Sequence, residues 1–214
     1  MDFNLPQFSQ TEDLCEVNLA EMDKFCLCLG LPEKALDRIS IVLKFQLYST
    51  YLNYKIFGNV HNIVREINAL EFDRGSITKR ESKFKNGAAK GLWKKHYFDG
   101  TLACFAKNMF AECGDKLEKL EPLLQRKFAH EKSGYFPQEL SSKIARMISD
   151  KAYLSRARRG ALTGQYIVFS NSNGLRNFIC LARHDELHEA LSKMIEAGLS
   201  SLKSVRTHYY ELPN

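Results

Sequence analysis

The sequence predicts an α+β protein, mostly helical in its N-terminal two-thirds, with a small C-terminal antiparallel β-hairpin or sheet and a closing helix. Apolar residues recur every three to four positions along most of the chain, which is the period of an amphipathic helix. Two runs rich in β-branched and aromatic residues occur late, on either side of the turn-forming sequence NSNG. The 214 residues, 44% hydrophobic and 26% charged, have the composition of a globular protein with a substantial core.

The first 71 residues carry three helical patterns and are interpreted as a helical bundle segment. The sequence SQTE at 9–12 has the form of a capping box, and an apolar stripe follows it as far as Gly30. Pro32 is well placed in the first turn of a second helix, whose stripe continues to Gly58. A shorter third helix is expected from about Val60. The short connections favour antiparallel neighbours.

Segment 72–91 interrupts these patterns. It is polar and basic and contains three glycines, so it is predicted to be a loop or an inter-domain linker. Residues 92–214 would then hold further helices, the hairpin at 163–184 and a closing helix at 185–202, although one single domain is also compatible with the pattern. The tail SVRTHYYEL could supply a third strand, because an isolated hairpin is only marginally stable.

Positive charge is concentrated in two segments, although the net charge is only +6. Residues 74–96 hold eight Lys and Arg against one acid, and residues 143–159 hold six against one. The first 23 residues hold six acids and no Lys or Arg. Such concentrated charge is what a polyanionic partner requires. The alternative is a solvated basic face that the acidic N-terminus balances.

The N-terminus and the cysteines indicate a cytoplasmic protein with reduced thiols. The first residues show neither the basic region nor the apolar region of a secretory signal, so the six cysteines are not expected to form disulfides. No apolar run approaches the roughly 18–20 residues of a membrane span, and no membrane partner is expected. The C-x-C at 26–28 lacks a second pair at zinc-binding spacing, and neither a metal nor another cofactor is expected.

The sequence HDELH at 184–188 resembles the zinc-protease motif H-E-x-x-H, with Asp185 in the place of the catalytic glutamate. A zinc site needs both histidines in the interior of one helix. The preceding NFICLAR reads as a strand, and the apolar helical period begins only at Leu187. We therefore interpret this segment as a strand-to-helix junction, where Arg183 and His184 could contact a phosphate at a helix N-terminus. The alternative is an exposed strand end.

Three further basic motifs bear on function. GLWKKHYF at 91–98 interleaves bases with aromatic residues, which suits nucleic-acid contact, unless Trp93 belongs to the core and the segment is helical. RARRG at 156–160 could complement a helix dipole or recognise phosphate through its guanidinium groups. RKFAH at 126–130 resembles the R-x4–6-H motif of HEPN ribonuclease toxins. Only three residues separate its arginine and histidine, so the motif does not place the protein in the HEPN family.

These patterns predict a nucleic-acid-binding protein, with RNA favoured over DNA, and raise the hypothesis of a small metal-independent ribonuclease of the toxin kind. The candidates for acid–base catalysis are His96 and His184. The candidate phosphate contacts are Lys94, Lys95, Arg156, Arg158, Arg159 and Arg183. Both assignments require residues 91–98 and 156–184 to converge in space. The alternative is a non-enzymatic adaptor, inhibitor or immunity-type protein that binds an acidic protein surface, for example by adding a strand to the hairpin edge. Whether the protein is an enzyme, and its oligomeric state, stay open.

Overall fold

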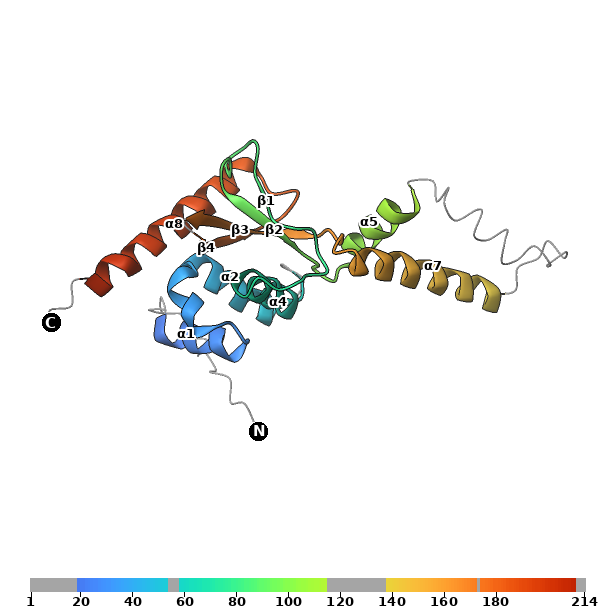
Figure 1. The fold of residues 1–214 in the computed structure, drawn as a ribbon, viewed down its shortest axis with the longest axis horizontal. Coiled ribbons are helices and arrows are strands. Elements are labelled where there is room, and N and C mark those ends of the chain that lie inside the picture. Colours follow the sequence, from blue (N-terminus) through green and yellow to red (C-terminus); the bar gives the residue numbers. More distant parts are fainter. Residues whose placement is uncertain (1–18, 54–57, 115–137, 173, 211–214) are drawn as a thin grey trace.

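The computed structural model describes residues 19–53, 58–114, 138–172 and 174–210, and within them the predicted α+β class is confirmed (Figure 1). One antiparallel sheet has the strand order β1-β2-β3-β4. The strands are β1 (Ser82–Lys83), β2 (Trp93–Tyr97), β3 (Gln165–Ser172) and β4 (Leu175–Ala182). The helices are α1 (Leu19–Cys28), the 3-10 helix η1 (Glu33–Arg38), α2 (Ile41–Leu52), α4 (Val60–Glu71), α5 (Leu102–Cys113), α7 (Gln138–Arg158) and α8 (His188–Tyr210). The capping box at 9–12 and the motif at 126–130 lie outside the described residues.

The predicted hairpin is confirmed as β3 and β4. Their register shifts between Val168, which pairs with Cys180, and Phe169, which pairs with Phe178. Ile179 is therefore the extra residue of a β-bulge. As a result, Ile179 and Cys180 both pack on the same face of the sheet, in the core that includes residues of α8.

The third long strand is β2, whereas the C-terminal tail was expected to supply it. β2 pairs with β3 along its whole length, and α8 stays helical as far as Tyr210. The possibility of a helix at 91–98 is therefore wrong. Alternation along β2 sends Lys95 and Tyr97 toward α4 and sends Lys94 and His96 to the opposite face.

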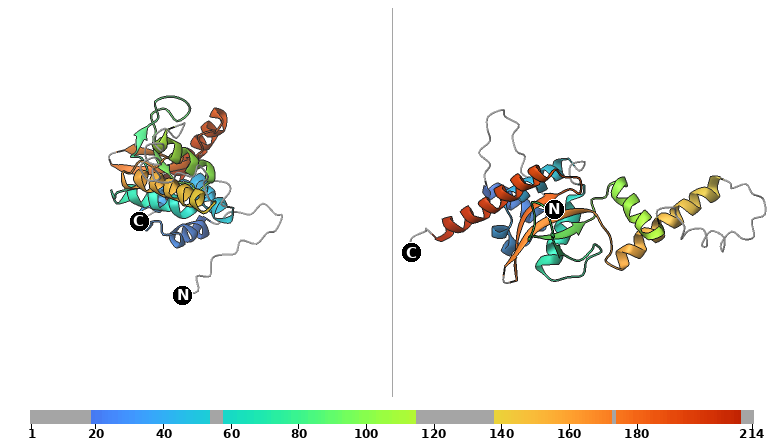
Figure 2. Two further views of the ribbon diagram at one scale, coloured as in Figure 1. Left: turned by 90° about the vertical axis from the view of Figure 1, so that its right-hand side faces the viewer. Right: turned by 90° about the horizontal axis from the view of Figure 1, so that it is seen from above.

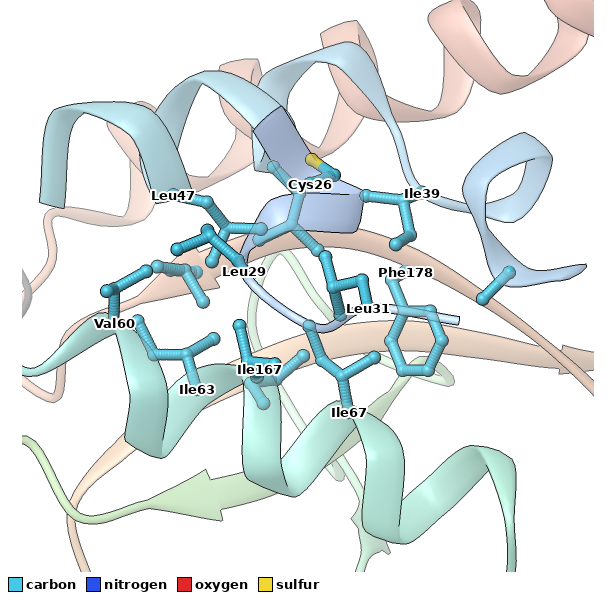
Figure 3. Packing of buried hydrophobic residues seen from close by; sticks show 14 of the residues in the cluster. Cys26, Leu29, Leu31, Ile39, Leu47, Val60, Ile63, Ile67, Ile167 and Phe178 are labelled. Carbon is cyan, nitrogen blue, oxygen red and sulfur yellow. The ribbon is translucent and has the colours of Figure 1, made fainter. Parts of the chain in front are cut away.

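Helices α1, α2 and α4, together with η1, cover one face of the sheet (Figure 1). The stripe of α4 recurs at helical spacing and turns Ile63 and Ile67 toward Ile167 and Phe178 of the hairpin (Figure 3). These four side chains are fully buried. The first face therefore carries the larger apolar core of the protein.

The second predicted helix is divided in two, and the break covers the edge of β4. Ile39 forms a parallel bridge with Phe178, and Ser40 N donates a hydrogen bond of 2.9 Å to Phe178 O. Gln46 then bonds both backbone groups of Leu181, accepting from N at 2.6 Å and donating to O at 3.2 Å. Local periodicity cannot reveal this long-range pairing. The β4 edge of the hairpin is consequently occupied. The interaction-module alternative had assumed that this edge is open to a partner strand.

The closing helix α8 lies across the other face of the sheet (Figure 2). It begins at His188 and ends at Tyr210, later at both ends than the predicted 185–202. Gly198 allows its close approach to the bulge, because a Cβ there would lie 2.8 Å from Ile179 Cγ2 and 2.9 Å from Ile179 O. Among the described residues, none of the helices has both the length and the apolar character needed to cross a membrane.

Helices α5 and α7 pack against each other and project from one end of the sheet as a helical arm (Figures 1 and 2). Asn108 of α5, only 1% exposed, joins this arm to the start of β3. Its Oδ1 accepts from Thr163 N at 2.8 Å and from Arg156 Nε at 3.1 Å, and its Nδ2 donates to Thr163 O at 2.7 Å. Segment 72–91, expected to be a loop or linker, contains β1 and bridges to the same region through Thr78 and Leu162.

Candidate functional site

Three side chains at one end of the sheet form what we call the His–Tyr cluster: His96 of β2, Tyr166 of β3 and His184, just beyond β4. The ring centroids lie 4.3 Å apart for Tyr166 and His184, 4.8 Å for His96 and Tyr166, and 5.8 Å for the two histidines. Residues 91–98 and 156–184 therefore do converge, and both predicted acid–base candidates lie at the point of convergence.

One backbone carbonyl organises the cluster. His184 Nε2 lies 2.8 Å and His96 Nδ1 lies 3.0 Å from the carbonyl oxygen of Gly164. A carbonyl oxygen only accepts, so His184 carries its proton on Nε2 and presents Nδ1 as an acceptor. The Tyr166 hydroxyl lies 2.8 Å from Nδ1 and therefore donates to it. The result is a directed chain of hydrogen bonds from Tyr166 through His184 to Gly164.

Only glycine can occupy position 164. A Cβ built there would lie 1.8 Å from the carbonyl oxygen of Tyr97 and 2.8 Å from its carbonyl carbon. Both atoms belong to the backbone of β2, which is hydrogen-bonded to β3 and cannot move aside cheaply. The absence of a side chain thus lets the start of β3 approach β2 and places the carbonyl oxygen between the two imidazoles.

Both imidazoles favour the neutral form. Burial lowers the pKa of His96 from 6.5 to about 4. Burial also lowers the pKa of His184, although its ring is more exposed. The hydrogen bond to Gly164 and the charge of Asp185 oppose this shift, whereas the positive charges of Lys107 and Lys94 add to it. Burial raises the pKa of Tyr166. At neutral pH the cluster therefore contains a protonated tyrosine next to an uncharged imidazole that can accept its proton.

Two lysines surround the cluster. Lys94 Nζ lies 4.9 Å from the centroid of Tyr166 and 4.8 Å from that of Phe84, within the range of cation–π attraction. The exposed Lys107 of α5 and His184 both line a small hollow of about 50 Å³. Lys94 was predicted as a phosphate contact, and its position beside the cluster is compatible with that role. Tyr166 and Lys107 were not identified from the sequence, since only the strand register and the packing of α5 bring them here.

The segment after β4 differs from the predicted phosphate site at a helix N-terminus. Residues 184–185 form a turn, and α8 begins only at His188. The guanidinium of Arg183 is engaged by Asp185, with Nε and Nη2 donating to its carboxylate at 3.2 and 3.1 Å. His184 lies in this turn and His188 is the first residue of α8, so the two do not lie in the interior of one helix. This confirms the interpretation of the segment as a strand-to-helix junction. Within the described ranges, no group of three His, Cys, Asp or Glu side chains is placed to hold a metal ion.

Two other predicted phosphate contacts are interior residues. Lys95 is 3% exposed, and its Nζ donates to Thr78 Oγ1 at 2.8 Å and pairs with the buried Glu66 at 3.3 Å. Burial lowers its pKa, and Glu66 partly opposes this shift. Arg156 is 7% exposed and bonded to Asn108 inside the helical arm. Burial and protein partners leave little of either side chain accessible to a polymer of phosphates, although Lys95 reaches the lining of a neighbouring hollow.

A second feature, which we call the basic hollow, lies where α4, segment 73–81 and the end of α7 meet. Its volume is about 730 Å³. The basic residues lining it are Arg74, Arg80, Lys95, Arg158, Arg159 and Arg176. Arg176 pairs with Asp73 and Glu81, and Arg159 pairs with Glu112. By contrast, Arg74, Arg80 and Arg158 are exposed and form no ion pair with any described residue. Of these three, only Arg158 was predicted individually; the charge of segment 74–96 was the signal for the others.

The His–Tyr cluster and the basic hollow lie on opposite faces of the sheet, because the adjacent residues His96 and Lys95 point in opposite directions. The predicted site, in which the histidines and the α7 arginines were expected to come together, is therefore divided into two. Comparisons with protein-family models, curated proteins and solved structures found no match. With no matching family, the chemistry of these two sites is what indicates function.

Proposed function

We propose that the protein binds RNA by contacting its phosphates in the basic hollow. The observation that carries this proposal is the set of three exposed guanidinium groups, Arg74, Arg80 and Arg158, which surround one concavity and form no ion pair with a carboxylate among the described residues. Guanidinium groups bind phosphate oxygens in a bidentate manner, and neutralising several phosphates releases counterions. The volume of about 730 Å³ lies within the range that accommodates a nucleotide-sized group.

Single-stranded RNA fits this surface better than an acidic protein does. Phe72 is 42% exposed, and Arg74 lies 4.9 Å from the centroid of its ring. An exposed ring beside phosphate-binding arginines offers a stacking surface to an unpaired base, in addition to the charge. Carboxylates of an acidic protein would use the charge but not the ring. Aromatic side chains can stack on any base, so we expect the protein to show only a weak preference for RNA sequence.

The test is the salt dependence of binding to a short labelled single-stranded RNA, measured by fluorescence anisotropy between about 50 and 200 mM salt. Arg158→Glu reverses one charge in the hollow, and Arg146→Glu reverses an exposed charge elsewhere on the same helix. We expect Arg158→Glu to weaken binding about tenfold or more and to lower the slope of log K against log salt by about 0.7 for the lost phosphate contact. We expect Arg146→Glu to change the affinity less than about twofold, because its charge is screened from the hollow.

The outcomes are distinct. Equal losses in the two variants would show diffuse attraction to the net charge and would contradict a site in the hollow. An absence of RNA binding at low salt, together with binding to an acidic polypeptide, would favour the adaptor class. Tighter binding to single-stranded DNA than to RNA of the same sequence would contradict the assignment of RNA.

A further inference from the structure

We propose that the His–Tyr cluster, together with Lys94, is a catalytic site that cleaves RNA by transesterification, on the face of the sheet opposite the basic hollow. This inference rests on the proposed function only in taking RNA as the substrate. The cluster has its own cations and its own access to solvent through His184 and Lys107, which are both exposed. The two sites can therefore be tested separately.

The arrangement meets the geometric requirement of an activated hydroxyl. Such a site needs a hydroxyl and a base within hydrogen-bond reach, with a third group that orients the base. Here the hydroxyl of Tyr166 lies 2.8 Å from His184 Nδ1, and the carbonyl of Gly164 holds His184 Nε2 at 2.8 Å. The carbonyl fixes the tautomer that leaves Nδ1 free to accept a proton. Stacking on His96 holds the His184 ring at 5.8 Å between centroids.

The reaction begins when the 2′-hydroxyl of RNA gives its proton to the oxygen of Tyr166, as Tyr166 passes its own proton to His184 Nδ1. The 2′-oxygen forms a bond to the adjacent phosphorus, and the bond from phosphorus to the 5′-oxygen breaks. The ammonium of Lys94 protonates the departing 5′-oxygen. His184 then loses its extra proton to solvent, and Lys94 regains one. The net change moves one proton from a 2′-hydroxyl to a 5′-hydroxyl and leaves a 2′,3′-cyclic phosphate, so no other reactant is consumed.

Electrostatics around the cluster suit this reaction. The pentacoordinate phosphorane carries more negative charge than the diester, and Lys94 and Lys107 supply positive charge where it develops. Lys94 is held beside the tyrosine whose hydroxyl acts as the base, because its Nζ lies 4.9 Å from the centroid of the Tyr166 ring. DNA cannot react in this way, since it lacks the 2′-hydroxyl. The substrate class is therefore RNA, cleaved within a single-stranded region in which the 2′-oxygen can align with the scissile bond.

The experiment incubates the full chain with labelled single-stranded RNA, and separately with DNA of the same sequence, in the presence of EDTA. The products are examined for a 2′,3′-cyclic phosphate. Tyr166→Phe removes only the hydroxyl and keeps the ring that packs against Phe84 and His96. Tyr153→Phe makes the same change on α7, where the ring stacks with Phe105. His184→Gln is matched by His188→Gln, four residues further along the chain.

We expect RNA but not DNA to be cleaved, and Tyr166→Phe and His184→Gln to lower the rate at least about a hundredfold, as for loss of acid–base catalysis. Tyr153→Phe and His188→Gln should retain the rate within about twofold. The wild-type rate should fall on acidification below neutral pH, as His184 becomes protonated and loses its acceptor. Thermal melting of each variant separates loss of chemistry from loss of fold.

Absence of RNA cleavage by the wild-type protein would overturn the proposal, and so would equal cleavage by wild type and by a folded Tyr166→Phe variant. Neither result would affect binding in the basic hollow, which Arg158→Glu reports independently. Conversely, Arg158→Glu and wild type could bind RNA equally while the wild-type protein cleaves it. That result would refute RNA binding in the basic hollow and would leave the catalytic proposal for the His–Tyr cluster intact. Cleavage of DNA at the same rate would exclude the 2′-hydroxyl mechanism.

Discussion

Acidification should destabilise the protein through His96, which is buried in the folded state and hydrated in the unfolded state. The ring is 9% exposed and packs against Tyr166 and His184, with Nδ1 directed at Gly164. Its pKa is lowered from 6.5 to about 4 because burial disfavours the imidazolium. As pH falls from neutral, His96 of the unfolded chain therefore binds a proton while His96 of the folded protein stays neutral. The free energy of unfolding decreases as a result.

The size of the effect follows from the two pKa values. With 6.5 in the unfolded state and about 4 in the folded state, the loss from His96 reaches about 2 kcal/mol at pH 5 and about 3 kcal/mol at pH 4. Below the folded-state pKa the loss levels off, since both states are then protonated. Because total stabilities are commonly about 5–15 kcal/mol, a change of this size is readily measured.

Urea unfolding followed by circular dichroism at a series of pH values gives the free energy of unfolding. Comparison of wild type with His96→Gln removes the contribution of the other titrating groups, because both proteins share them. The difference between the two proteins should change by about 2 kcal/mol between pH 7.5 and pH 5, in favour of the variant at acid pH. An NMR titration of the His96 ring gives its pKa directly.

A constant difference between wild type and His96→Gln across that pH range would refute the reasoning, and so would an NMR pKa near 6.5. Either result would mean that water reaches the ring in solution, and that the cluster is more open than its packing indicates. A change of opposite sign would mean that a carboxylate stabilises the imidazolium.

Two further predictions concern the supports of the His–Tyr cluster. Gly164→Ala should lower the free energy of unfolding by more than about 3 kcal/mol, because its Cβ would meet the Tyr97 carbonyl at 1.8 Å; retention of wild-type stability in urea unfolding would contradict this close approach. Asn108→Ala should cost about 3 kcal/mol, because it leaves the buried donors of Thr163 N and Arg156 Nε without their acceptor, and calorimetry should detect a lowered Tm. A loss below about 1 kcal/mol for Asn108→Ala would mean that water replaces the amide in this position.

The His–Tyr cluster and the basic hollow lie on opposite faces of the sheet as a consequence of strand geometry. Lys95 and His96 are neighbours in the sequence, yet one pairs with Glu66 beneath the basic hollow and the other stacks in the His–Tyr cluster. A bound RNA that used both sites would have to pass around the end of the sheet. The exposed cations Arg158 and Lys107 lie at the two sides of this end, on α7 and α5.

The sequence by itself determined the α+β class, the hairpin, most helices and the concentration of positive charge. These features depend on local periodicity, turn-forming residues and composition, which neighbours along the chain largely specify. The sequence also indicated His96 and His184 as a pair. It suggested Arg156 and Lys95 as phosphate contacts only because exposure cannot be read from residue type.

Only the tertiary structure decided that 93–97 is a strand, that Ile39–Ser40 leaves the helix to cover β4, and that Tyr166 joins the two histidines. The first two depend on partners more than 60 residues away in the chain, namely β3 for residues 93–97 and Phe178 for Ile39. The third brings Tyr166 and His184, which are 18 residues apart, together with the distant His96. Strand register and the space available at one glycine then determine which side chains meet. Local sequence contains neither, which is why the candidate residues were predicted in part and their arrangement was not.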